Sequence, residues 1–592
     1  MCNAQDLIRP DLLREKHHII LNIGMAMINT TVNGSASRAA LLNLLRRLHF
    51  YIGLFVAPFI FVAALTGTLY VLTPQIENVI YADALTVQPQ GEARPLSEQI
   101  TAARRYAGES IGIYAVRPAP GATDTTRVQF NDPTLAASES RSIFIDPYTL
   151  QVKGDMTVYG TSGVLPLRMW LDQLHRGLLL GDFGRNYSEL AASWLWVAAL
   201  GGVILWLSAR PRRKVKKVSG KFVLTRHWHI TLGLVLLVGL VFFSVTGLTW
   251  SQWAGNNIDR MRSELNWLTP QVNTSLNAIA PAPADPHAEH QGAMDGMDMS
   301  GMAMPATAMH KAENVNRADG DWDRVLHAAR ENGIAAAKVE LRQPKAADKA
   351  WTVTEVDRSW PSQVDSVSVN PENFSIVDRV RFASFPLVAK LTRWGVDAHM
   401  GVLFGLPNQL LLAAFGLGLC VMIVLGYRMW WLRRPAVANA NPARTLLAAW
   451  QAVPPVGKTV SAVVALALGY ALPVMGISLL AFLVVDILRG KRHQQRAHDT
   501  LPGAETGKFF MRRETKRFIT AVAVVLLTAL TIMSKVMIGG AIDEYHIPLS
   551  NWSVEMLVTQ IFMIVVYSSV FTGLLSIPLW YWFLGEKEAD KA

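Results

Sequence analysis

Long apolar runs alternate with two long polar stretches along this chain. Runs of about 20 apolar residues can cross a bilayer as helices, and four of them lie at about 50–72, 189–207, 230–250 and 408–427. The pattern predicts an integral membrane protein that is mainly α-helical.

A second group of apolar segments follows the fourth span. The stretch at 459–488 is interrupted by "GYALPVMG" and has basic residues at both ends, which favours a membrane hairpin over one long span. Two further spans are expected at about 518–538 and 557–583. About four membrane segments therefore follow a core of four helices.

The two polar stretches resemble each other. Each opens with a helical pattern, "LSEQITAARRYAG" (96–108) in the first and "DWDRVLHAARENG" (321–333) in the second. Each continues with alternating β-branched segments separated by turn residues, which is typical of a small sheet beside a helix. We expect two α+β domains outside the membrane.

These patterns divide the chain into ten segments. They are an N-terminal cytoplasmic segment, the first span, outer domain 1, the second span, a cytoplasmic loop, the third span, outer domain 2 with an insert, the fourth span, a membrane hairpin and a two-helix C-terminal membrane domain. In that order their bounds are 1–40, 41–75, 76–186, 187–209, 210–226, 227–252, 253–405 with the insert at 286–310, 406–432, 455–490 and 507–588.

Charge gives the orientation of the spans. The net charge is +11, and basic clusters such as "RPRRKVKK" (210–217) and "RMWWLRRP" (428–435) follow spans directly. Basic loops stay in the cytoplasm, so both termini are expected inside and the polar domains in the periplasm of a Gram-negative cell.

No basic stripe with interleaved aromatic residues occurs in a soluble segment, so nucleic acid is not an expected partner. The two cysteines exclude a thiolate metal site.

The first and third spans are copies of each other. "HFYIGLFVAPFIFVAALTG" (49–67) aligns with "HITLGLVLLVGLVFFSVTG" (229–247), and in both the histidine precedes a Thr-Gly pair by 17 residues. Because both helices start on the cytoplasmic side, His49 and His229 are expected at equal depth near that face.

The second and fourth spans also correspond. "HRGLLLG" (175–181) aligns with "HMGVLFG" (399–405), each just before its span. His175 and His399 are therefore expected at equal depth near the outer face. The duplication gives two histidine pairs, one at each side of the membrane.

Paired axial imidazoles suit a b-type haem iron. Gly53 and Gly233 follow their histidines by four residues, on the same helix face, and would leave room for a porphyrin. His227 is an alternative to His229, and interfacial histidines without a ligand are the simpler interpretation. Five arginines are near enough in sequence to pair with haem propionates: Arg46, Arg47, Arg176, Arg185 and Arg226.

A second candidate site is the insert "HAEHQGAMDGMDMSGMAMPATAMH" (287–310). Thioether and imidazole groups suit copper, and the insert has six methionines and three histidines. The candidate metal contacts are His287, His290, Met297, Met299, Met302 and His310. The alternative is a linker whose composition cannot build a core.

"LHFYIGLFVAPFIFVAALTGTLYV", "LHRGLLLG" and "VTGLTW" together resemble the PepSY-associated transmembrane helix family, often called iron-regulated membrane proteins. Members include siderophore-iron reductases of the bacterial inner membrane that bind haem through membrane histidines. The resemblance implies a duplicated four-helix haem-binding core with two periplasmic α+β PepSY-like domains. It also implies His49, His175, His229 and His399 as ligands of haem b, two per chain. Residues 507–588 resemble a small uncharacterised family of two-helix membrane proteins.

The resemblance favours an inner-membrane electron-transfer enzyme. A cytoplasmic or quinol donor would supply electrons, and a periplasmic ferric siderophore or other metal complex would accept them. Periplasmic Cu(II) is an alternative acceptor, favoured by the insert. Two other hypotheses are a haem-free PepSY interaction protein and a metal permease. The apolar middles of the spans lack the ionisable groups that a permease would need.

Overall fold

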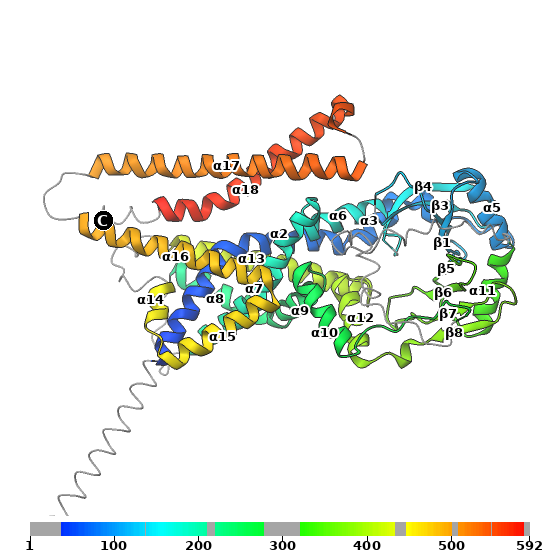
Figure 1. The fold of residues 1–592 in the computed structure, drawn as a ribbon, viewed down its shortest axis with the longest axis horizontal. Coiled ribbons are helices and arrows are strands. Elements are labelled where there is room, and N and C mark those ends of the chain that lie inside the picture. The colour runs from blue at the N-terminus through cyan, green and yellow to red at the C-terminus, as the bar shows by residue number, and fades with distance from the viewer. Residues whose placement is uncertain are drawn as a thin grey trace, which may run out of the picture.

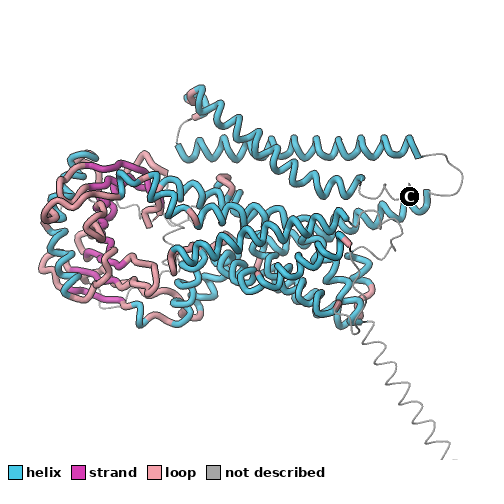
Figure 2. Tube along the Cα trace, turned by 180° about the vertical axis from the view of Figure 1, so that it is seen from behind, coloured by secondary structure: helices cyan, strands magenta, loops and turns pink. Residues whose placement is uncertain are grey.

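A computed structural model places a helical bundle at one end of the molecule and a β-sheet at the other (Figure 1). The residues it describes are 37–136, 138–160, 162–209, 220–277, 320–432, 446–499, 507–545 and 548–584. Most of them are helical, and the strands gather in one antiparallel sheet (Figure 2). The expectation of a mainly α-helical membrane protein is confirmed.

Within the described residues, five helices are long and apolar enough to cross a membrane, and one bent helix pair is a sixth candidate. These are the first helix (Ser37–Val71), α7 (Gly181–Ser208), α13 (Leu406–Leu432), Thr515–Gly539 of α17, Val554–Gly573 of α18, and the pair α8 (Lys221–Val235) with α9 (Leu237–Thr249). The first helix contains a π-helical turn, η1 (Ile52–Val56), and ends as α2 (Ala57–Val71).

The third span differs from its expected form. The sequence suggested one helix at about 230–250, but α8 and α9 meet at Leu236 with a bend of 58°. On α9, close to the bend, Gly239 packs tightly against α13. A Cβ added to Gly239 would lie 2.2 Å from the ring of Phe415. A glycine is needed where two helices approach this closely.

Shorter helices complete the bundle. Near the sheet they are α3 (Thr73–Ile80), α4 (Ala82–Leu85), α6 (Pro166–Gly177), α10 (Trp253–Glu264) and α12 (Leu387–His399). At the other end are α14 (Leu446–Gln451) and two consecutive apolar helices, α15 (Pro455–Ala471) and α16 (Pro473–Asp499). The last two pack against each other through Gly469 and Gly476, whose backbones are in contact.

The two C-terminal helices pack on the outside of the bundle (Figures 1 and 2). They are α17 (Gly507–Tyr545) and α18 (Val554–Leu584). Met533 and Met537 of α17 and Ile564 of α18 bury apolar surface against Tyr187 of α7 and the α6–α7 turn.

The two outer domains share one sheet, which corrects the expectation of a separate sheet in each. Its strand order is β4-β3-β2-β1-β5-β6-β7-β8, and every neighbouring pair is antiparallel. The strands are β1 (Ile113–Arg117), β2 (Thr126–Phe130), β3 (Glu139–Ile145), β4 (Val152–Tyr159), β5 (Val339–Arg342), β6 (Trp351–Glu355), β7 (Ser366–Val369) and β8 (Ile376–Val380). Joining β1 to β5 removes an exposed edge from each half.

Side chains reinforce this junction, because β1 and β5 share only the register pair Val116–Leu341. Helices α5 (Leu96–Ala107) and α11 (Asp321–Glu331) cover one face of the sheet, and the carboxylate of Asp323 accepts the backbone N–H groups of Leu96 and Ser97 at 2.7 and 2.9 Å. One half of the sheet thus supplies the helix cap of the other.

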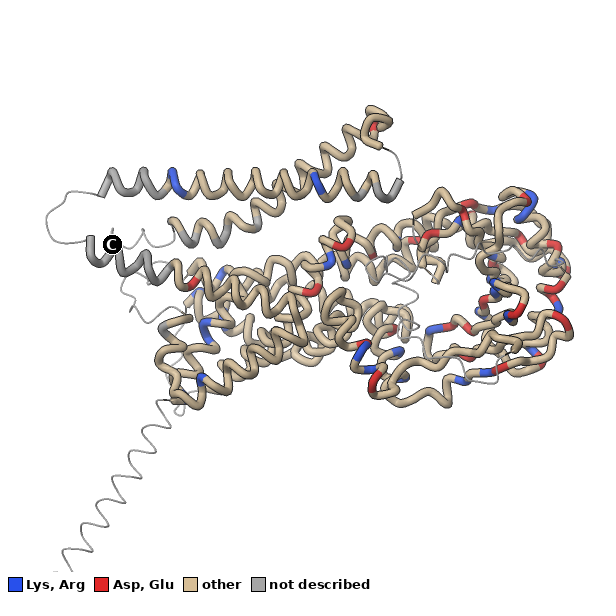
Figure 3. Tube along the Cα trace, in the orientation of Figure 1, with Lys and Arg blue, Asp and Glu red and all other residues tan. Residues whose placement is uncertain are grey.

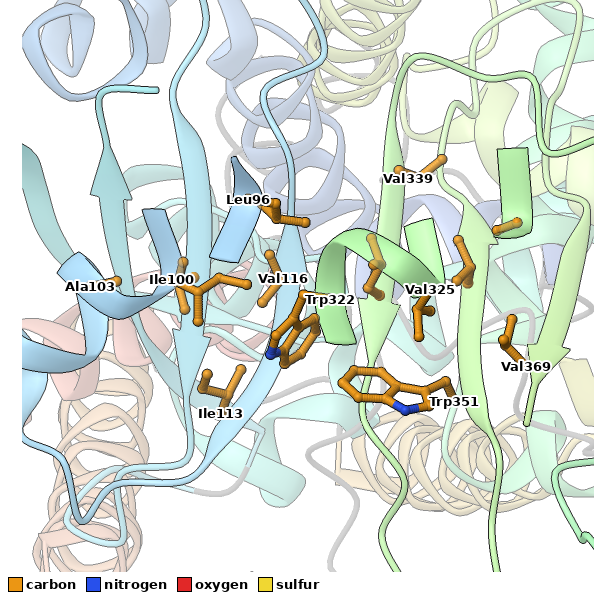
Figure 4. Packing of buried hydrophobic residues seen from close by; sticks show 14 of the residues in the cluster. Leu96, Ile100, Ala103, Ile113, Val116, Trp322, Val325, Val339, Trp351 and Val369 are labelled. Carbon is orange, nitrogen blue, oxygen red and sulfur yellow. The ribbon is translucent and has the colours of Figure 1, made fainter. Parts of the chain in front are cut away.

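Apolar packing also crosses the junction (Figure 4). Trp322 of α11 and Trp351 of β6 are fully buried, with ring centroids 4.6 Å apart in an edge-to-face arrangement. They belong to one cluster with Ile100 and Val116 from the first half. A single hydrophobic core therefore serves both halves.

A buried ion pair holds β1 to β5 on the opposite face. Arg117 donates to Glu340 from Nε at 2.8 Å and from Nη2 at 2.6 Å, and Arg342 donates to the second oxygen of Glu340 at 2.7 Å. Burial alone raises the pKa of the Glu340 carboxyl, but the two guanidinium groups outweigh it, so this pKa lies below its usual value.

We expect Glu340→Gln to loosen the junction by about 3 kcal/mol, because it leaves Arg117 buried without its counter-charge. Hydrogen exchange at the amides of Val116 and Leu341 should lose roughly 100-fold in protection. Lowering the pH should act in the same direction. A carboxyl whose pKa is depressed on folding stabilises the fold above its unfolded pKa, near 4.5 here, and that stability disappears as the pH falls through the folded pKa.

Glu98→Gln is the matched control, because Glu98 forms an exposed ion pair with Arg94 in the same part of the molecule. Exposed pairs contribute little, so protection should be unchanged in this variant. Equal effects of the two substitutions would contradict a structural role for the Arg117–Glu340 pair.

Candidate functional site

The four histidines related by the duplication form two pairs. His49 lies on the first helix and His229 on α8, and the two interact electrostatically. His175 lies near the end of α6 and His399 ends α12, and these two also interact electrostatically. All four histidines are half-buried.

The two pairs lie about one bilayer thickness apart. Thr66, which contacts His175, follows His49 by 17 residues on the first helix. At 1.5 Å per residue this corresponds to about 26 Å, close to the roughly 30 Å of a hydrocarbon core. This is the separation expected of two sites at opposite ends of one membrane span.

The Thr-Gly pairs that follow His49 and His229 by 17 residues contact the other two histidines. Oγ1 of Thr66 lies 3.0 Å from Nδ1 of His175, and Oγ1 of Thr246 lies 2.7 Å from Nδ1 of His399. Each threonine hydroxyl also donates to the carbonyl four residues earlier, at 2.8 Å in both cases.

This double contact of the hydroxyl favours one histidine tautomer. A hydroxyl has one hydrogen, and here that hydrogen goes to the backbone carbonyl, so the oxygen accepts from the ring. Nδ1 of His175 and Nδ1 of His399 are then the protonated nitrogens. In a neutral imidazole this leaves the lone pair on Nε2, the atom that binds a metal.

The other pair is oriented by backbone carbonyls. Nδ1 of His229 donates to the carbonyl of Met422 at 3.0 Å. Ala198 precedes Met422 by 224 residues, the offset that also relates His175 to His399, and its carbonyl interacts with the ring of His49. Nδ1 of His49 is buried and, among the described residues, makes no hydrogen bond of ordinary geometry.

Glycines that the sequence reasoning missed leave space beside three of the rings. A Cβ would lie 3.0 Å from Cε1 of His175 if added to Gly67, 3.3 Å from Cε1 of His49 if added to Gly202, and 3.6 Å from Cε1 of His229 if added to Gly426. Gly202 and Gly426 are again 224 residues apart, so a repeat alignment carried this signal.

The glycines chosen from the sequence have a different setting. A Cβ on Gly53 would meet nothing within 4 Å, and one on Gly233 would meet only the sulfur of Met422 at 3.5 Å. Neither glycine touches a histidine ring, but the open space that we expected beside Gly53 is present.

A cavity lies between His175 and His399. Its wall is mostly apolar and includes small residues of α2 and α7, the rings of Phe243, Phe415 and Trp250, and the side chain of Arg176. The ring centroid of His399 lies 4.9 Å from that of Phe243 and 5.1 Å from that of Trp250. An apolar slot with an imidazole at each side suits a flat, largely apolar cofactor.

Other sequence candidates fall into three groups. His227 is exposed and packs against Trp228, so His229 is the histidine of this segment that faces the interior. Arg176 lines the cavity, whereas Arg185 donates to the carbonyl of Trp250 at 3.1 Å and Arg46 to Asn43 at 2.7 Å. The six candidate metal contacts of the insert lie outside the described residues. They are His287, His290, Met297, Met299, Met302 and His310.

Within the described part of the chain, no group of three or more His, Cys, Asp or Glu side chains is placed to hold a metal ion. The paired imidazoles are the donors that the described residues bring together. Two donors suit an iron whose other ligands come from a porphyrin.

Two buried carboxylates that sequence reasoning also missed brace the histidine helices. Asp397, two residues before His399, accepts Nε of Arg358 at 2.6 Å. Asp486 of α16 accepts the hydroxyl of Tyr51, two residues after His49, and caps α14 through the N–H of Leu446 at 2.8 Å. Asp486 stands alone in an apolar run, "FLVVDILRG", and that was the available signal.

Comparison with known proteins matches two parts of the chain to protein families. A family model described as "PepSY-associated TM region" matches residues 46–433, and one described as a protein of unknown function (DUF2534) matches residues 508–587. Over 73 residues, 12% of this chain, the sequence is 47% identical to the uncharacterized protein YnaJ of Escherichia coli strain K12, and equally to YnaJ of strains O6:H1 (CFT073) and O157:H7. The match covers 86% of YnaJ.

We expect Gly67→Ala to destabilise the protein by about 1–3 kcal/mol, because the new methyl group must displace the ring of His175, which Thr66 holds in place. Gly53→Ala is the control, since its methyl group enters open space and alanine is the better helix former. Thermal unfolding in detergent should show a lower midpoint only for Gly67→Ala. A midpoint for Gly67→Ala at or above the native value would contradict the close ring–glycine contact.

Proposed function

Since the chain belongs to the family of the PepSY-associated TM region, we propose that it is a di-haem b electron-transfer protein of the bacterial inner membrane. Its substrate would be a ferric complex in the periplasm, with ferric siderophore as the leading candidate. One observation carries the proposal: two half-buried imidazole pairs lie about a bilayer apart, and three of the four rings have Nδ1 bonded, which leaves Nε2 for a metal.

The donor set fits the cofactor. His49 with His229 would hold one haem and His175 with His399 the other, and haem iron when bound exchanges single electrons. Thr66, Thr246 and the carbonyl of Met422 fix the ring orientations. Outer hydrogen bonds of this kind raise the basicity of a histidine ligand. The cavity beside His399 has a mostly apolar wall, which suits the porphyrin face.

The basic loops support an orientation with both termini in the cytoplasm and the sheet in the periplasm. A cytoplasmic or quinol donor would reduce the His49/His229 side. The His175/His399 side lies next to the sheet and would deliver the electron there. Reduction of Fe(III) to Fe(II) weakens its binding by hard oxygen ligands, so the chelator would release the iron. Periplasmic Cu(II) is the alternative acceptor.

The test is a visible spectrum of the full chain, purified in detergent after expression with haem available. We expect a low-spin b-type spectrum with about two haems per chain. His175→Ala and His229→Ala should each remove about one haem, because each takes away one ligand of a different pair.

His227→Ala is the matched control, since it removes an exposed imidazole two residues from His229. Its haem content should equal that of the native protein. A colourless native protein would contradict the proposal and favour a haem-free interaction role for the family fold. Equal haem loss from His227→Ala and His229→Ala would contradict the assigned ligand.

A further inference from the structure

A large polar cavity lies on the face of the sheet that turns toward the membrane helices. It has a volume of about 950 Å³ and is bounded by strands of both half-sheets, by the segment 269–274 and by residues of α3 and α12. Along each strand alternate side chains point to opposite faces, so Val116 and Val128 enter the core while Arg117 and Arg127 line the cavity. We call it the sheet chamber.

The sheet chamber is strongly basic. Eight Lys and Arg side chains line it, against three Asp and Glu. Basic residues come from β1, β2 and β5 and from the loop between β5 and β6, where Lys345 and Lys349 stand. Figure 3 shows the basic residues along the strands that border the space between sheet and bundle. A cleft with one dominant sign of charge concentrates ligands of the opposite sign.

Arg127 is a cation of the sheet chamber with a like charge beside it. It stands directly opposite Arg117 in the β1–β2 register, an arrangement that destabilises a sheet. Glu340 neutralises Arg117. Among the described residues the guanidinium of Arg127 forms no hydrogen bond or close ion pair; it stacks on Phe144 at 5.2 Å, and the charges of Glu77 and Asp124 offset its own only at longer range. Burial, followed by the nearby charge of Arg117, lowers the pKa of Arg127 to about 10.

Such a placement costs stability, and a ligand would recover it. Natural chains retain destabilising charges mainly where function uses them. A guanidinium group that faces a polar cavity and has a second guanidinium opposite is suited to bidentate contact with a carboxylate or phosphate.

The sheet chamber lies next to the outer histidine pair. Arg393 of α12 lines it, and His399 ends the same helix six residues later, about 9 Å along the axis. Arg358, another lining residue, donates to Asp397 beside His399. A ligand in the chamber is therefore held close to the histidines assigned to the outer haem.

We propose that the sheet chamber binds an anionic metal chelate whose free groups are carboxylates, such as a ferric hydroxycarboxylate, with Arg127 as a direct contact. The inference rests on the proposed function for the identity of the metal and narrows its substrate class to negatively charged chelates. Binding itself requires no electron transfer, so it is measured separately.

The experiment is equilibrium binding of Ga(III) citrate, a chelate that cannot be reduced in water, to the purified full chain. We expect saturable binding that weakens with added salt, and no comparable binding of a neutral gallium trihydroxamate. Arg127→Gln should weaken the affinity about tenfold or more, because a charge-assisted bidentate contact is lost. Arg127→Lys should fall between the two.

Arg105→Gln is the matched control, since it removes the same charge from the exposed face of α5 on the far side of the sheet. Its affinity should be native. The unfolding midpoint of ligand-free Arg127→Gln should be native or higher, because the like-charge contact with Arg117 is gone; a purely structural arginine would give a lower midpoint.

Unchanged affinity in Arg127→Gln overturns the inference, as does equally strong competition by inorganic pyrophosphate, which would indicate a general anion site. The two proposals fail separately. Arg127-dependent binding by a haem-free protein would refute only the haem assignment. A haem-loaded protein that reduces neutral and anionic ferric complexes alike, with no effect of Arg127→Gln, would refute only the chamber.

Discussion

An imidazole ring among membrane helices gains stability from a hydrogen-bond partner, because little water is there to bind it. This constraint shapes the helical core. Each threonine of a Thr-Gly pair accepts Nδ1–H of a histidine and donates its own proton to its helix backbone, so one hydroxyl serves both groups. Each bond contributes about 1 kcal/mol. Its larger consequence is directional, since a fixed Nδ1 proton leaves Nε2 as the metal-binding atom, and the duplication repeats the device in both halves.

The sheet depends on the same duplication but uses it differently. Two half-sheets that would each expose an edge strand join at β1 and β5, and their helices cap one another through Asp323. The joined sheet forms one wall of the sheet chamber, which Arg393 of α12 also lines. Arg358, another lining residue, donates to Asp397, two residues from His399. One ion pair thus connects a wall of the sheet chamber to the helix that ends at His399.

The sequence predicted the spans and both histidine pairings, because hydropathy and a repeated 17-residue spacing are local signals. It did not predict the joined sheet, since pairing between strands more than 200 residues apart leaves no local mark. It used Thr66 and Thr246 only to align the repeats, although their hydroxyls hold the rings. The bend at Leu236 and the glycines facing the histidines depend on which helices pack together, which periodicity does not determine. Asp486 alone carried a readable signal, as an acid in an apolar run.

The proposed passage of electrons across the membrane through the two histidine pairs can be measured as vectorial electron transfer in proteoliposomes. Vesicles with the haem-loaded chain would enclose a reductant that cannot cross the bilayer, with Fe(III) citrate outside as acceptor. We expect Fe(II) formation outside that requires the protein and is lost in His175→Ala and in His229→Ala alike, since each interrupts the route at a different face. External Fe(II) formation that persists in either variant, or that fails with a fully haem-loaded native protein, would contradict it.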